Sequence, residues 1–572
     1  MVVKNPWVGY LTRSYAAVKS SILTRLKTAA PEITDYSESN ILTVIIGIFS
    51  GITEMLNYYI DAVAREGFLE TAKRLVSVKK IVKLINYRIR ASISATADLT
   101  FTATDADGNP QVVAVGETIT IPQYTAVSNS QGKTFLTVRV GYITEGLSAV
   151  SIPARQQQIV GLTPIGLSSG AIDQYFTLPQ DYDDNTLYVE VGGEPWKLVN
   201  HFGFSGPTAK HFIVRIDNGD YPYLKFGDNI NGAIPLSGSI IALSYRITDG
   251  SKGILPANTL TTLVGTISIP SQVPAISEIK VNNLNPSVGG VDIETLERIR
   301  KSAPLYLRTL ERAVTRQDYI DVAKLAPSVD KAQLVFNCGK VITIFVSPIG
   351  GGIASTQMLS DTYDFISDKG IIGLPVDVKA AGETLIGMEL SVTAKFRVNT
   401  NLAVTDIHNT LVNAFSPENS DINKPVRISD IIALVDNLDK VDYLELVKIY
   451  AIPYARPIGQ NKELSWERVP LDGHPVIPVN WKLIWNGANF ILYKGDVQVT
   501  TLTLNTSYTY LNILTVKILA IPAGISNGDR WEFKTYPLNK DILLDDYTMP
   551  RVSPALNYIS VTVKEQSFNG IL

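Results

Sequence analysis

Cysteine is almost absent from this chain. The 572 residues include one cysteine, Cys338, which excludes an intramolecular disulfide framework and any zinc site built from several thiolates. Histidine is also scarce: it occurs at His201, His211, His408 and His474, without the spacing of a metal-binding motif such as H-E-x-x-H. We therefore expect no metal, no cofactor and no enzymatic activity that depends on them.

An excess of charge of one sign is also missing. The 51 basic side chains are matched by 54 acidic ones, and the net charge is −3. A protein that binds nucleic acid mainly through the phosphate backbone needs a basic excess, because its affinity comes from releasing counterions. We therefore expect no nucleic acid as a main partner.

Long hydrophobic runs are missing as well. The most apolar stretch, Ile41 to Ile52, is soon followed by Glu54, whereas a transmembrane helix needs about 20 apolar residues. A buried helix is the better interpretation, and no membrane insertion is expected. The N-terminus shows no basic region followed by an apolar core and a cleavage site, so we expect no secretory signal and assembly in the cytoplasm.

The length and the changing pattern of the chain indicate several domains. At 572 residues and 45% hydrophobic, the chain is too long for one core, and about three or four domains are expected. We predict a multidomain α+β protein. Its parts are an N-terminal helical segment at 1–90, one or two antiparallel β-rich domains at 91–285, an α+β domain with a split βαβ arrangement at 286–450, and an all-β domain at 451–572.

An apolar stripe marks the most hydrophobic helix of the N-terminal segment. Its members are Ile41, Ile45, Ile48, Phe49, Ile52 and Leu56. Neighbouring apolar residues widen the stripe beyond one face, so this helix must be covered on several sides. An intrachain helical bundle would cover it, and so would helices of neighbouring chains.

The β-rich regions are predicted from alternation and turn signals. The clearest strand runs from Ile386 to Val398, where every second residue is apolar. A hairpin is expected around Asn337-Cys338-Gly339. The last domain is rich in aromatic residues. Its tryptophans could form a face that binds carbohydrate or protein, although in small β-sandwiches they are more often core; they are Trp466, Trp481, Trp485 and Trp531.

A charged, helix-prone passage from Gly289 to Tyr319 separates the β-rich first half from the mixed second half. We predict a first helix that Asp292 caps and Pro304 ends or kinks, then a second one that begins at a capping box between Thr315 and Asp318. The charges of both signs form either a solvated face or a docking surface for another subunit. The candidate lateral contacts are Arg298, Arg308, Glu311 and Arg312.

Motifs that carry chemistry are weak. Gly166 to Gly170 matches G-x-S-x-G, but it lies in a turn-dense β region rather than between a parallel strand and a helix. Gly350 to Gly352 lacks the lysine of a phosphate-binding loop, and Asp105 to Gly108 lacks the final bidentate acid of a calcium loop. The acid pairs Asp183-Asp184 and Asp545-Asp546 are expected to be solvated turns. We predict loops and turns at all of these positions.

The charged passage resembles the baseplate J-like wedge proteins of contractile-tailed bacteriophages. The resemblance rests on an ordered series, not on one motif: Gly289-Gly290-Val291-Asp292, Glu294, Glu297, Arg300, Ala303-Pro304, Arg312-Ala313-Val314-Thr315, Asp318-Tyr319, Pro327 and Val329. The family also has a helical N-terminus and a β-rich middle that ends in a Phe-Gly-Asp turn, here Phe226-Gly227-Asp228. The resemblance covers roughly residues 30–450, and the all-β domain lies outside it.

The resemblance implies a structural, non-enzymatic protein of the virion. Wedge proteins of this family join into a six-fold ring around the central hub of the tail baseplate and relay the trigger for sheath contraction. The implied partners are other copies of the chain, other wedge proteins, the hub, and the sheath or tube proteins, and the helices supply intersubunit bundles. The alternative is a receptor- or carbohydrate-binding tail protein that uses the tryptophan-rich domain.

Overall fold

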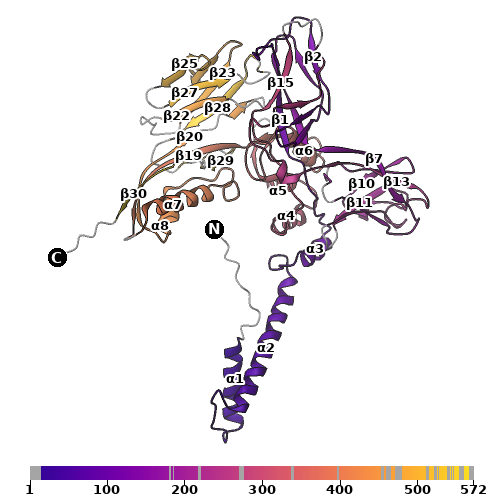
Figure 1. The fold of residues 1–572 in the computed structure, drawn as a ribbon, viewed down its shortest axis with the longest axis vertical. Coiled ribbons are helices and arrows are strands. Elements are labelled where there is room, and N and C mark those ends of the chain that lie inside the picture. Colours follow the sequence, from indigo (N-terminus) through magenta and orange to yellow (C-terminus); the bar gives the residue numbers. More distant parts are fainter. Residues whose placement is uncertain are drawn as a thin grey trace, which may run out of the picture.

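The protein consists of several lobes around a central α/β unit, with a helical hairpin that projects away from them (Figure 1). The computed structural model describes residues 14–565 except 180–181, 184–185, 217–220, 270–275, 337–340, 396–397, 453–455, 459–464, 471–478, 511–513, 521–524, 526, 537–541, 543, 545–546 and 553–558. Two β domains lie on one side of the central unit, and a second α/β sheet with its own β domain lies on the other.

The N-terminal segment is helical, as its periodicity predicts. The helices are α1 (Tyr15–Ala29), α2 (Ile41–Glu66) and α3 (Leu75–Leu84). Ser14 caps α1 and Asn40 caps α2, because each side chain accepts a hydrogen bond from a backbone amide of the first turn. Helix α2 continues beyond the apolar run and past Glu54 to Glu66, since one exposed acidic residue does not interrupt a helix.

The first β domain contains a six-stranded sheet in the order β14-β3-β4-β6-β1-β15 and a separate hairpin of β2 and β5. The strands are β1 (Thr96–Thr104), β2 (Thr118–Ile121), β3 (Ala126–Ser128), β4 (Thr134–Thr137), β5 (Gly141–Thr144), β6 (Ala149–Gln156), β14 (Thr262–Val264) and β15 (Glu278–Asn283). Its core includes Leu99, Phe101 and Phe135, all fully buried. The second β domain is inserted between β6 and β14.

The second β domain is one sheet in the order β7-β13-β9-β10-β11-β12-β8. The strands are β7 (Gln158–Leu167), β8 (Tyr175–Thr177), β9 (Tyr188–Val191), β10 (Glu194–Leu198), β11 (His211–Ile216), β12 (Pro222–Lys225) and β13 (Ile240–Ile247). The Phe-Gly-Asp turn follows β12. Phe226 is core, and a Cβ on Gly227 would lie 2.2 Å from the carbonyl oxygen of Gly232, so the turn requires glycine there.

The central unit has a three-stranded sheet, β16-β17-β18, packed with helices. Its elements are α4 (Leu296–Thr309), α5 (Arg316–Leu325), β16 (Val329–Phe336), β17 (Ile342–Pro348), α6 (Thr356–Ser367) and β18 (Val376–Ala380). The capping box between Thr315 and Asp318 is confirmed. One detail of α4 was predicted wrongly: Thr295 caps it instead of Asp292. Of the two outcomes predicted at Pro304, the helix does not end there but continues to Thr309, because a missing amide does not necessarily end a helix.

The second sheet contains β19 (Gly382–Ala394), β20 (Val441–Ile452), β29 (Thr548–Arg551) and β30 (Ile559–Glu565), with α7 (Thr400–Ala414) and α8 (Ile428–Asp436). The predicted strand is confirmed as β19, although it ends at Ala394, before Val398. β29 and β30 both pair with β19 in parallel, so the end of the chain returns to this sheet. The predicted turn at Asn337-Cys338-Gly339 lies outside the described residues.

Between β20 and β29 the chain forms the all-β part. Its strands are β21 (Arg456–Ile458), β22 (Ser465–Pro470), β23 (Val479–Trp485), β24 (Phe490–Lys494), β25 (Val497–Leu502), β26 (Ser507–Tyr510), β27 (Leu514–Ala520) and β28 (Arg530–Thr535). They form one sheet of five strands and one of three. Trp481 and Trp531 are fully buried and Trp485 nearly so, which confirms them as core. The side chain of Trp466 lies outside the described residues.

Candidate assembly site

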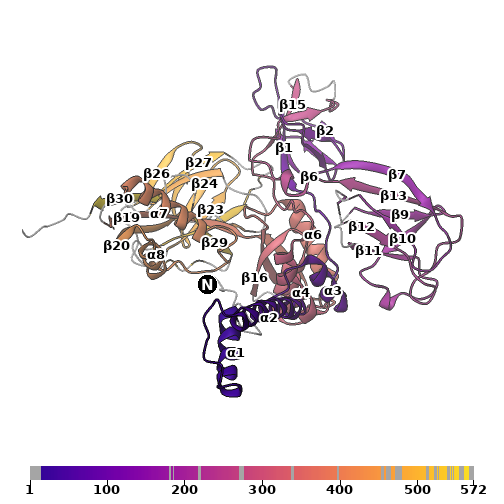
Figure 2. The same ribbon diagram turned by 60° about the horizontal axis from the view of Figure 1, so that its bottom comes forward.

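The helical hairpin carries its apolar residues on the outside. Helix α1 is the main element that packs against α2, and the hairpin extends away from the rest of the chain (Figures 1 and 2). Only Thr43, Ile46 and Ser50 of α2 are buried. Two of these three are polar, so the face turned toward α1 is not the apolar one.

The outer face of α2 has a heptad spacing. Residues three and four apart along it are exposed: Ile41 78%, Ile45 43%, Ile48 59%, Ile52 47%, Met55 57% and Tyr59 59%. Phe49 at 61% and Leu56 at 56% lie beside them. Alternating spacings of four and three place side chains on one seam, the pattern by which helices of a coiled coil meet. The predicted stripe thus exists, but the prediction that the helix is buried is wrong for the single chain.

By length and composition α2 could also cross a membrane. Its most apolar 18-residue window has a mean hydropathy of 1.5 and is 17% buried. Length and composition alone are weak evidence for a span, because helices of soluble assemblies meet the same criterion. The polar side of α2 offers a further contact within the protein: the amide of Tyr15 donates to Glu54 Oε1 at 3.1 Å.

The base of the hairpin is fixed to the central unit. Arg300 of α4 donates from Nε to the carbonyl oxygen of Leu69 at 3.1 Å and from NH2 to that of Ala72. Below these contacts Val78 and Val82 of α3 pack in one buried cluster with α4. Since the carbonyls belong to the segment between α2 and α3, Arg300 joins that segment directly to α4.

The predicted lateral contacts lie together around α4, but most make contacts within the chain. Arg298 NH1 donates to Asp330 Oδ1 at 2.9 Å, and Arg308 pairs with Asp321, a carboxylate that is only 1% exposed. Asn200 Nδ2 donates to Glu311 Oε1 at 2.5 Å. Arg312 is exposed to solvent.

An aliphatic cluster lies on the same face. Five large side chains are exposed there, namely Leu307 52%, Leu310 56%, Val314 62%, Ile371 46% and Ile372 101%. Leu307 lies in the last turn of α4 and the other four in two loops. The two loops are joined, because the amide of Ala313 donates to the carbonyl of Lys369 at 2.9 Å. Sequence reasoning missed this cluster, since its members come from segments 60 residues apart and share no periodicity.

The polar groups of the motifs that resemble catalytic or binding sites form hydrogen bonds within the chain. Ser168 of the G-x-S-x-G match is buried in a loop after β7, and its hydroxyl donates to the carbonyl of Pro235 at 2.9 Å. The amide of Gly352, which would face a phosphate, donates instead to Glu383 Oε1 at 2.9 Å. Asp105 Oδ1 accepts from the amides of Asp107 and Asn109 in a local turn. The predicted loops or turns are confirmed at Gly350 to Gly352 and at Asp105 to Gly108. In the first motif the loop begins at Ser168, because Gly166 and Leu167 belong to β7.

The predicted acidic pairs and the possible metal ligands do not form a catalytic site among the residues that the structure describes. Asp183 is buried and accepts from Ser94 Oγ at 2.5 Å, so it is not the solvated turn we predicted, because that hydroxyl replaces water. Asp184, Asp545 and Asp546 lie outside the described residues. Within the described part of the chain, no group of three or more His, Cys, Asp or Glu side chains could hold a metal ion.

The helical hairpin and the helix that follows it match a known protein family. Residues 14–84 match the family described as bacteriophage baseplate protein, N-terminal domain, and this range contains α1, α2 and α3. No curated protein sequence matches the chain. A chain from the cryo-EM structure of the anti-feeding prophage (AFP) baseplate, 6-fold symmetrised, is 16% identical, covering 75% of this chain and 86% of that one.

The TM-score of that structural match is 0.27. The family match concerns the N-terminal segment. That segment forms the projecting hairpin and the helix that attaches it to the central unit. The N-terminal segment of the chain is therefore similar to the N-terminal domain of bacteriophage baseplate proteins.

Proposed function

We propose that the protein is a wedge component of a contractile-tail baseplate. Copies of it join with other wedge proteins into a six-fold ring around the central hub, and the ring relays the trigger for sheath contraction. The observation that carries the proposal is the exposed heptad seam of α2 within a baseplate domain. A seam of this kind is stable when a second helix covers it.

The covering helices belong to neighbouring chains. Burying a large aliphatic side chain completely is worth about 1.5–3 kcal/mol, and the seam residues are roughly half exposed. Six such positions therefore make about 6 kcal/mol of burial available to each chain. The intrachain alternative has little support, because α1 packs on the other face of α2.

The relay is supported by the way the hairpin is attached. The bundle would move α2, Arg300 would carry that motion into α4, and α4 packs against α5 of the central sheet. A switch of this kind requires interfaces with two packings of similar energy. The mixed contacts around α4 suit such a role.

The lateral contact between subunits is proposed for the same face of α4. Arg312 and the aliphatic cluster of Leu307, Leu310, Val314, Ile371 and Ile372 are exposed there. The contacts within the chain would stabilise the conformation of this face. They are made by Arg298, Arg308 and Glu311. A rim of charge around an apolar centre is typical of protein interfaces.

The copy number of the chain in purified particles tests the proposal. Quantitative mass spectrometry with isotope-labelled peptides would count it against a tail protein of known stoichiometry. We expect a multiple of six. A multiple of three that is not a multiple of six would indicate a fibre or spike, and near absence from particles would refute a structural role. The receptor-binding alternative has lost support, since three of its tryptophans are core.

A further inference from the structure

The second β domain exposes large aliphatic side chains on its outer loops. One loop joins β7 to β8, and the other joins β12 to β13. They lie side by side, because the amide of Ser168 donates to the carbonyl of Ser239 at 2.9 Å and the amide of Gly238 donates to the carbonyl of Ser168 at 2.8 Å. The exposed residues of these loops and of the adjoining strand ends are Leu167 64%, Ile172 66%, Leu236 80% and Ile240 53%.

The apolar surface continues onto two neighbouring turns. The loop between β12 and β13 carries Ile230, which is 72% exposed, and the short helix η1 (Phe202–Phe204) carries Phe204, which is 94% exposed. The two turns are in contact, since the amide of Gly232 donates to the carbonyl of Gly206 at 3.2 Å. We call the six residues the outer patch: Leu167, Ile172, Phe204, Ile230, Leu236 and Ile240.

The polar groups of the same loops are bonded within the domain. Asp228 Oδ1 accepts from the amides of Asn231 at 2.6 Å and Ile230 at 2.9 Å, and these amides hold the pKa of the Asp228 carboxyl below its usual range. Asp173 pairs with Lys225 at 3.0 Å. The loops are therefore preorganised, so a partner that covers the outer patch loses little free energy in ordering them. Because these charges are already compensated, the patch favours an apolar partner.

The outer patch is large enough for a stable interface. A fully exposed side chain of this size presents about 200 Å², so the six exposed fractions correspond to on the order of 800 Å² in total. Specific interfaces bury about 800 Å² on each partner, whereas the largest apolar patch of a typical monomer covers about 300–600 Å².

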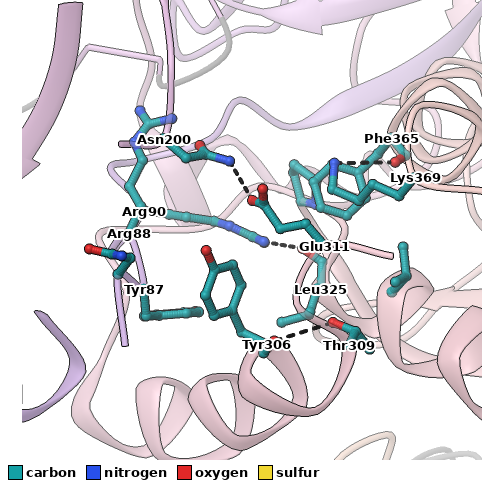
Figure 3. A pocket seen from close by; sticks show the side chains of 13 residues that line it. Tyr87, Arg88, Arg90, Asn200, Tyr306, Thr309, Glu311, Leu325, Phe365 and Lys369 are labelled. Carbon is teal, nitrogen blue, oxygen red and sulfur yellow. Dashed lines mark hydrogen bonds between the residues drawn. The ribbon is translucent and has the colours of Figure 1, made fainter. Parts of the chain in front are cut away.

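The domain that carries the outer patch is joined to the face of α4. Asn200 Nδ2, in the loop after β10, donates to Glu311 Oε1 at 2.5 Å, and Arg90 donates from NH2 to the carbonyl of Leu325 in α5. Figure 3 shows both contacts at a small pocket between the two parts. Glu311 lies in the loop after α4 that also carries Leu310 and Val314 of the aliphatic cluster. A closed ring needs the same angle between the two surfaces in every copy, and this joint favours one angle.

Identical copies that join head to tail need two different surfaces on each chain. The aliphatic cluster beside α4 supplies one of them. We propose that the outer patch is the other, and that it packs on the aliphatic cluster of the next copy. This inference rests on the proposed function, because it names the second surface of the lateral contact. Both surfaces are exposed in the single chain, so neither covers the other within one molecule.

Chemical crosslinking in assembled particles tests the contact. Cys338→Ser removes the native cysteine, and Leu236→Cys with Ile372→Cys places one thiol on each surface. A bismaleimide is expected to join position 236 of one copy to position 372 of the next, so that a denaturing gel shows a ladder of covalent oligomers. Either cysteine alone should give no ladder, because a head-to-tail contact brings different positions together. The control pairs Ile372→Cys with Gln131→Cys, an exposed residue of the first β domain, and should give none.

The copy number separates this inference from the proposed function. A chain count that is a multiple of six, together with monomers only after crosslinking, would overturn the contact and leave the wedge role standing. Crosslinks from position 236 to a different protein would overturn it as well. Near absence of the chain from particles would instead refute the proposed function itself.

Leu236→Lys provides a second measurement that does not depend on the geometry of two thiols. A lysine in an apolar contact loses water without gaining a partner, so the number of contractile particles should fall about tenfold or more. Circular dichroism should not change, because the residue is 80% exposed in the single chain. The control is Val497→Lys, at a 70% exposed residue of the all-β part, which should assemble normally. Normal particle numbers for Leu236→Lys would contradict the proposal.

Discussion

Replacing two residues of the α2 seam should abolish assembly without unfolding the protein. Ile45 and Phe49 are 43% and 61% exposed in the single chain. Each has about half of its surface left to bury, which is worth about 1 kcal/mol in an interface. An aspartate in its place adds a carboxylate that loses water without gaining a partner, at a cost of about 2 kcal/mol or more.

The double variant Ile45→Asp, Phe49→Asp therefore loses about 6 kcal/mol of association free energy, a factor on the order of 10⁴ in affinity. The free energy of unfolding of the single chain should change by less than about 1 kcal/mol, because both side chains are exposed there. Circular dichroism and thermal unfolding measure the second quantity. The first is measured by supplying the variant to a phage that lacks its own copy of the gene and counting contractile particles.

The matched control carries the same charges elsewhere on the hairpin. Ser21 and Thr24 are exposed polar residues of α1, so Ser21→Asp, Thr24→Asp should assemble normally. The reasoning is refuted if the α2 variant is folded and still gives normal numbers of contractile particles. It is also refuted if the control fails to assemble in the same way, since the effect would then come from charge alone.

Three further predictions concern contacts between elements of the fold. Arg308→Ala leaves the buried carboxylate of Asp321 without its cation and should lower the free energy of unfolding by about 3 kcal/mol. The control Arg312→Ala should lower it by less than about 0.5 kcal/mol. Equal losses for the two variants in denaturant titrations would contradict the pairing. Burial raises the pKa of Asp98, so its contribution to stability is full in acid and is lost as the pH rises through that raised pKa. Asp98→Asn should therefore raise the melting temperature at neutral pH but not at pH 3, and a pH-independent change would count against this. Ile299→Ala opens a cavity between α3 and α4 and should cost about 2–5 kcal/mol, with faster proteolysis of the hairpin as the readout.

Local signals were sufficient to predict several elements from the sequence. The capping box at Thr315 follows from side chains within one turn of the helix. Such hydrogen bonds do not depend on the rest of the fold. The strand β19 was also predictable up to Ala394, because one face is buried and its residues alternate.

Other features depend on contacts between distant parts of the chain. The pairing of β29 and β30 with β19 joins strands more than 150 residues apart, and the Arg551–Glu383 ion pair depends on it. The same holds for the hydrogen bond between Asn200 and Glu311, which lie 111 residues apart in the sequence. Composition predicted that α2 must be covered, but it contains no information about which molecule covers it.

Photo-crosslinking from α2 in assembled particles tests the central claim most directly. Phe49 is replaced by p-benzoylphenylalanine, the particles are purified and irradiated, and the crosslinked peptides are identified by mass spectrometry. The same photo-reactive residue at Thr24 of α1 is the control. We predict crosslinks from position 49 to a helix of another polypeptide chain. Particles that assemble normally but give only crosslinks within the chain, or none above the control, would contradict the account.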